Sequence, residues 1–97
     1  MKRQVNNSAN AALKELQTMP GVGPKVAVDL YDLGYRNVAN LAGADPEAMY
    51  RRICANGHVD RCMLYVFRCV VYYAGRRKHD PELLKWWNWS DEKCRAR

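Results

Sequence analysis

The sequence predicts a small all-α domain, a compact bundle of about five short helices. Apolar residues recur with helical spacing in several segments, and no segment alternates between apolar and polar residues. Asp45-Pro46 and Asp80-Pro81 are both typical helix starts, since Asp caps the first turn and Pro fits its first position. With 97 residues, of which 48% are hydrophobic, the chain can bury one modest core but not two.

Two helices joined by a glycine-containing turn are predicted in the first third of the chain. The first runs from about Asn10 to Thr18 with Leu13 and Leu16 directed inward. The second runs from about Pro24 to Leu33, and Gly34 suits its end. Its apolar stripe consists of Val26, Ala27, Leu30 and Leu33. A short turn over 38–42 follows, which Asn37 can cap.

Three further helices are predicted in the remainder. The Asp45-Pro46 helix ends near Asn56-Gly57 and directs inward Met49, Tyr50, Ile53 and Cys54. A longer helix from about Asp60 to Gly75 has an apolar face of Met63, Val66, Phe67, Val70 and Ala74. Asp80-Pro81 begins a last short helix that runs into three tryptophans, which either close the core or stack on bases. We expect a flexible tail over 1–9, one domain over 10–90 and a basic tail over 91–97.

The turn between the first two helices is the best candidate binding site. Its two glycines leave the backbone N–H groups uncovered, and the helix that begins at Pro24 points its positive end the same way. Such a turn can hold a phosphate group, and Lys25 adds a cation. The predicted phosphate site therefore consists of Gly21, Val22, Gly23 and Lys25. The alternative is that the glycines only permit a tight turn between helices.

A second candidate surface lies on the polar side of the 60–75 helix. Arginines and tyrosines alternate there along one stripe, which suits a nucleic-acid backbone or exposed bases, although an ordinary solvated helix face is the alternative. The stripe consists of Arg61, Tyr65, Arg68, Tyr72 and Arg76. The formal net charge is +6, and residues 1–48 carry five basic and five acidic side chains, so the whole excess lies in the second half. The charge therefore favours nucleic acid, whereas its placement away from the glycine turn does not.

The segment Leu16 to Leu30, with Met19-Pro20-Gly21-Val22-Gly23-Pro24-Lys25 at its centre, resembles a helix-hairpin-helix motif. This resemblance implies that backbone N–H groups of the hairpin bind DNA phosphate without reading sequence. In proteins with two such hairpins the second one follows about 33–36 residues later, where Gly57 lies. The turn at 55–60 lacks paired glycines and would be a degenerate copy, with Arg51, Arg52 and Arg61 near it. Two hairpins could then clamp one duplex.

A wider resemblance covers about residues 13–90. The segments 30–34 and 40–47, together with Tyr50, Cys54, Cys62, Phe67, Tyr73 and the tryptophan-rich end, are similar to the bacterial pathogenicity-locus family, whose members are often described as mitomycin-resistance proteins. This resemblance implies a compact helical domain of the sterile-alpha-motif-like group and a link to DNA damage. It names no reaction.

Other site types have weaker support. The spacing of Cys54, His58, Cys62 and Cys69 is not that of a typical zinc site, and thiols packed between helices are the simpler interpretation, so no metal or cofactor is expected. No nucleophile–base pair is recognisable, and Asp45 is better explained as a helix cap than as a glycosylase acid, so we expect no enzyme. Without an apolar run that could be a signal peptide or span a membrane, we expect a soluble cytoplasmic protein.

DNA is thus the expected partner, and binding through the backbone without catalysis is the expected function. The rival hypothesis is a protein-interaction domain that docks on a DNA-processing protein or on a second copy of itself. The oligomeric state is left open.

Overall fold

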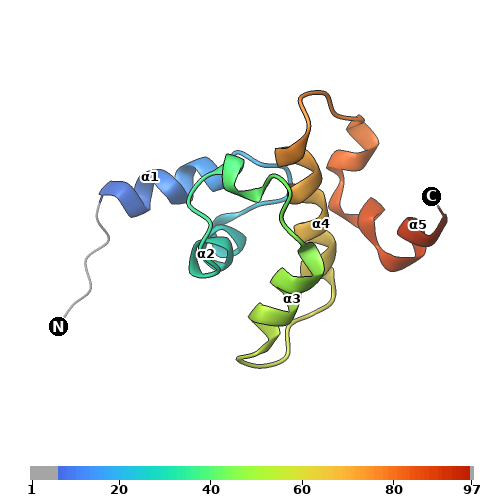
Figure 1. Ribbon diagram of the computed structural model, residues 1–97, viewed down its shortest axis with the longest axis horizontal. Coiled ribbons are helices and arrows are strands. Elements are labelled where there is room, and N and C mark those ends of the chain that lie inside the picture. Colours follow the sequence, from blue (N-terminus) through green and yellow to red (C-terminus); the bar gives the residue numbers. More distant parts are fainter. Residues whose placement is uncertain (1–6, 97) are drawn as a thin grey trace.

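Five α-helices and three short 3-10 helices follow one another along the chain in the computed structural model, which describes residues 7–96 and contains no β-strand there (Figure 1). In order they are α1 (Asn7–Leu16), α2 (Pro24–Asp32), η1 (Val38–Leu41), α3 (Pro46–Cys54), α4 (Cys62–Gly75), η2 (Pro81–Leu84), η3 (Trp86–Trp89) and α5 (Asp91–Ala96). The predicted all-α bundle is confirmed.

Both Asp-Pro pairs begin helices, as predicted. The carboxylate of Asp45 accepts a hydrogen bond from the Glu47 amide at 3.0 Å, and Pro46 is the first residue of α3. Asp80 does the same for the Glu82 amide at 3.0 Å. The last predicted helix, however, is divided into η2 and η3, because the chain is extended at Lys85.

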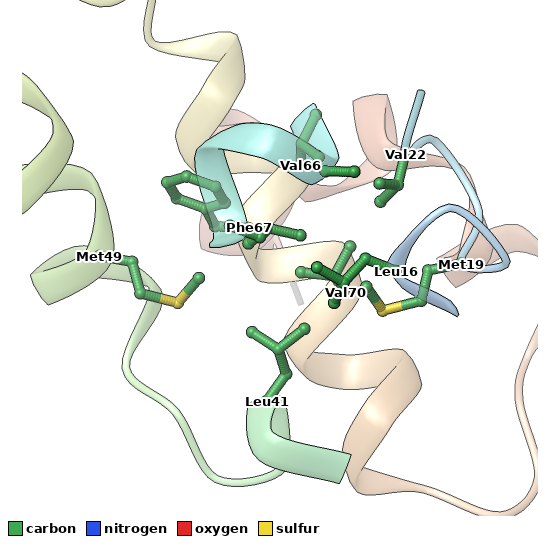
Figure 2. Packing of buried hydrophobic residues seen from close by; sticks show 10 residues of the cluster. Leu16, Met19, Val22, Leu41, Met49, Val66, Phe67 and Val70 are labelled. Atoms are coloured by element: carbon green, nitrogen blue, oxygen red, sulfur yellow. The ribbon is translucent and has the colours of Figure 1, made fainter. Parts of the chain in front are cut away.

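The core is built around α4, which lies in the middle of the molecule (Figure 1). Phe67 and Val70 of α4 are completely buried. Figure 2 shows Leu16, Leu41 and Met49, from three different elements, directed toward them. Helix α4 contributes three buried side chains to this single core, whereas η2 and α5 contribute none, as expected for a chain of this size in which one helix is central.

The polar stripe of α4 lies against the C-terminal elements and is not a free surface. The Tyr65 hydroxyl donates to the Asp91 carboxylate at 3.3 Å, and the Tyr72 ring lies 5.3 Å from the Trp89 ring. The Tyr72 hydroxyl also accepts from the Asp80 amide at 2.8 Å. Helix α4 consequently has packing partners on both sides. The rings of Tyr65 and Tyr72 are partly covered by these contacts, which argues against the predicted stacking of bases on the stripe.

Residues 7–9 and 91–96, which were expected to belong to the two tails, are helical in the structure. Helix α1 already begins at Asn7, within an alanine-rich stretch of high helix propensity, while residues 1–6 of the expected N-terminal tail lie outside the described residues. At the other end the expected basic tail is helix α5. The backbone amide of Lys93 in α5 donates a hydrogen bond to the Ser90 hydroxyl at 3.3 Å, and Asp91 and Glu92 occupy the first turn of this helix. A serine cap followed by acidic residues is a helix start that the sequence reading missed.

Candidate functional site

The turn between α1 and α2, which we call the hairpin, comprises residues 19–23. The Val22 amide donates to the Met19 carbonyl at 3.3 Å, and Gly21 has φ +79°. With Pro20 in the second position, this is the pattern of a type II turn, which requires a positive φ in the third. Met19 and Val22 are buried and anchor the hairpin to the core, as Figure 2 shows.

Gly23 precedes α2 and leaves the start of that helix uncovered. Its backbone is extended, and no heavy atom outside its chain neighbours lies within 4 Å of the position that a Cβ would take. Among the described residues no acceptor is recorded for the amides of Gly23, Lys25 and Val26, and Pro24 has no N–H. Three unpaired donors therefore share the positive end of a nine-residue helix.

One side of the hairpin is closed by an indole ring. A Cβ on Gly21 would lie 3.3 Å from the Cδ1 atom of Trp86, whereas Gly23 has open space beside it. An anion could thus approach the hairpin from the Gly23 side, next to the exposed side chain of Lys25.

Lys25 also borders a cavity of about 440 Å³ between α2 and the turn that joins α3 to α4. Asp29, His58 and Asp60 line the same cavity, so its charges are mixed. Burial raises the pKa of Asp29 and the Lys25 ammonium partly offsets this. The structure thus brings the hairpin helix and the predicted second hairpin to one cavity.

The second turn, residues 55–61, carries its own anion. The Asp60 carboxylate accepts hydrogen bonds from the amide of Cys62 at 2.9 Å and from its thiol at 2.9 Å. These two bonds lower the pKa of Asp60. Because a carboxylate already occupies the start of α4, the degenerate hairpin has no vacant place for a phosphate there.

Three of the four arginines predicted to bind phosphate have partners within the chain. Arg61 forms a two-pronged ion pair with Asp91, the shorter N–O distance being 2.6 Å, and Arg52 donates to the Leu33 carbonyl at 2.9 Å. Arg68, whose side chain is only 15% exposed, contacts Glu47 at 2.7 Å, Asp91 at 3.0 Å and the Trp89 carbonyl at 2.9 Å. Arg51 is exposed, and no hydrogen bond or ion pair is recorded for it in the described part of the chain.

Comparison with protein-family models gives a match over residues 9–95 to the family described as "Cdd1: Pathogenicity locus". The chain belongs to this family. Comparisons with curated proteins and with solved structures gave no match. Membership of the pathogenicity-locus family covers the hairpin, α3, α4 and all C-terminal elements up to residue 95.

Cys62 and Cys69, two of the four residues weighed as a zinc site in this pathogenicity-locus domain, have different surroundings. Cys69 is buried beside the Leu83 carbonyl, and burial raises the pKa of its thiol to about 11. Cys62 is exposed, and the hydrogen bond from its thiol to the Asp60 carboxylate raises the pKa of that thiol. Within residues 7–96 no three His, Cys, Asp or Glu side chains form a group that could hold a metal ion.

The four cysteines of the domain are all free thiols. None of the described helices has the length and apolar character needed to cross a bilayer.

Proposed function

We propose that this pathogenicity-locus domain is a non-catalytic module that binds the phosphate backbone of DNA through the hairpin, without sequence specificity. The observation that carries the proposal is the uncovered backbone at Gly23, next to three unpaired amides and the Lys25 ammonium. Neutral N–H donors and a helix dipole bind a phosphate oxygen without reading a base. These features support the proposal that the hairpin is a helix-hairpin-helix motif.

Most of the predicted arginines have hydrogen-bond partners within the chain. This supports a smaller DNA interface than two hairpins that clamp one duplex. Arg52, Arg61 and Arg68 are each engaged by an acceptor of the chain itself, and Asp60 fills the second turn. We therefore assign the contact to the unpaired amides of Gly23, Lys25 and Val26 and to the Lys25 ammonium, with Arg51 as an additional cation. Of the other predicted residues, Val22 uses its amide in the turn, and Gly21 lies on the side that Trp86 closes. A site of this size binds weakly at physiological salt, because it neutralises few phosphates.

The cellular setting is part of the same proposal. Four free thiols fit a reducing compartment, and we place the protein in the cytoplasm. The resemblance to proteins described as mitomycin-resistance proteins suggests a link to DNA damage. The proposed function requires no metal, no cofactor and no chemical reaction.

The rival function is a protein-interaction domain whose hairpin does not bind DNA. It is favoured by Val28, which lies on α2 with 44% of its surface exposed. An exposed aliphatic side chain on the helix that follows the hairpin would suit a protein partner better than a phosphate backbone. Duplex binding separates the two functions, since a partner-docking surface has no affinity for DNA of any sequence.

The decisive experiment is a fluorescence anisotropy titration of labelled DNA with the wild type and Gly23→Glu at low salt. The extended backbone and open space at Gly23 accept a glutamate without strain. A carboxylate at the start of a helix is favourable for stability, so the variant should fold. It should lose affinity at least about tenfold, because the carboxylate competes for the same donors.

Gly75→Glu is the matched control. Gly75 is the last residue of α4 and also has open space around it. Its substitution by glutamate introduces the same charge change as Gly23→Glu, but at another position. Its affinity for DNA should remain within about twofold of the wild type. Equal losses of DNA affinity in the two variants would mean that only the net charge of the protein matters. If the wild type did not bind DNA at all, the rival function would be favoured.

A further inference from the structure

The three tryptophans near the C-terminus have different surroundings. The Trp89 indole donates to the Leu83 carbonyl at 2.7 Å and its ring contacts Tyr72. Trp86 packs against the core and against Gly21 of the hairpin. Trp87 has 54% of its surface exposed. Closing the core thus explains two of the rings but not the third.

Trp87 is nevertheless held by a contact with Trp86, the indole that closes one side of the hairpin. Its ring meets that of Trp86 edge to face, with 5.7 Å between the ring centroids and 85° between the planes. Trp86 in turn touches the hairpin at Gly21. One ring therefore separates the exposed indole from the turn that carries the uncovered amides.

We propose that Trp87 stacks on an unpaired nucleobase whose neighbouring phosphate is held by the hairpin, so that the preferred ligand is single-stranded nucleic acid. This inference rests on the proposed function of the hairpin. Every base offers a flat face to an indole, and such stacking tolerates any sequence. In an intact duplex the faces of the bases are stacked on one another, so the ring of Trp87 would meet only sugar and phosphate.

The charges of the chain favour this occupant over an apolar protein segment. The formal net charge is +6, and Lys25 stands exposed on the open side of the hairpin. Arg77 and Lys78 are also exposed, between α4 and η2. An exposed indole, one ring away from a turn with free amide donors and a cation, matches a nucleotide, which combines a flat base with an anionic phosphate.

The test compares Trp87→Ala and Trp87→Phe with the wild type on three labelled ligands of equal length: oligothymidylate, oligouridylate and a blunt duplex. Because Trp87 is exposed, both variants should keep the melting temperature of the wild type. Trp87→Ala should lose about tenfold in affinity for the single strand and less than about twofold for the duplex. Trp87→Phe should retain most of the single-strand affinity, since its ring can still stack.

The two single strands identify the source of the base. Tighter binding of oligothymidylate assigns DNA, and tighter binding of oligouridylate assigns RNA, with Trp87 required in both cases. The inference is overturned if Trp87→Ala binds the single strand like the wild type, or loses as much on the duplex.

Gly23→Glu, measured alongside, separates this failure from failure of the hairpin. If Gly23→Glu still abolishes binding, the hairpin function stands without Trp87. If Gly23→Glu has no effect on any ligand, the hairpin function and the stacking inference both fall.

Discussion

Gly21 and Gly23 lie in the same turn, but only one of them needs to be glycine for the fold. Gly21 has φ +79° and faces Trp86, whereas Gly23 has an ordinary extended backbone and open space. A glycine that the fold does not require is available for a ligand, since the missing side chain uncovers the amides at the start of α2.

Gly21→Ala should therefore destabilise the protein by about 1–2 kcal/mol, because a left-handed backbone is unfavourable for alanine. The added methyl would also lie 3.3 Å from the Trp86 ring, which must shift. Chemical denaturation followed by circular dichroism measures the loss. Gly23→Ala is the control and should change the free energy of unfolding by less than about 0.5 kcal/mol. Equal effects of both substitutions would contradict the assigned turn.

The hairpin residues were predictable from the sequence because their contacts are local. Pro20-Gly21 specifies the turn and Pro24 the start of the next helix, and all of these lie within a few residues of one another. The ion-pair partners of the arginines could not be predicted in this way. Arg61 pairs with Asp91 and Arg68 with Glu47, thirty and twenty-one residues away along the chain. A helical stripe shows which side chains share a face, but not which segment will cover it.

At the scale of elements, the carboxylate of Asp91 links α5 to α4 and to Arg61, which directly precedes α4. It accepts from Arg61 at 2.6 Å and from Arg68 at 3.0 Å, and also from the Tyr65 hydroxyl. The bond from Arg61 is the largest cause that holds the pKa of Asp91 well below its usual range, and Arg68 adds to it. Helix α5 has only six residues and no buried ones, so these bonds decide its position.

The lowered pKa predicts how stability depends on pH. Asp91 stabilises the folded state above the pKa of the unfolded chain, about 4, and this contribution is lost as the pH falls toward the lower pKa of the folded state. Asp91→Asn should melt at a lower temperature than the wild type near neutral pH. The difference should shrink below about pH 4, which thermal unfolding at several pH values measures.

Glu92→Gln is the matched control for Asp91→Asn. Glu92 is the next residue of α5, is exposed and forms no recorded ion pair in the described chain. Its substitution removes the same charge without breaking the contacts to α4. A pH profile of Asp91→Asn that ran parallel to that of the wild type would contradict the role of Asp91.

At the scale of the whole molecule, the all-α bundle followed from helical spacing and caps, which need no knowledge of tertiary contacts. The net charge of +6 also came directly from the sequence, but it overestimates the charge available to a ligand. Arg61 and Arg68 are neutralised by Asp91 and Glu47 within the fold. Three predicted site cations have no ion pair among the described residues: Lys25, Arg51 and Arg52. Arg52 donates only to the neutral carbonyl of Leu33.

This distribution of charge predicts a shallow salt dependence of DNA binding. Amide donors release no counterions, so only the free cations near the hairpin contribute, and the slope of log K against log salt should be about −1 to −3. Anisotropy titrations of one duplex between about 50 and about 200 mM salt measure it. Lys25→Gln should make the slope shallower by about one, whereas Arg61→Gln should leave it unchanged, because Asp91 already neutralises Arg61. A slope of −6 or steeper would mean that the paired arginines leave their partners to bind DNA. A slope of zero would mean that neither Lys25 nor Arg51 contacts a phosphate.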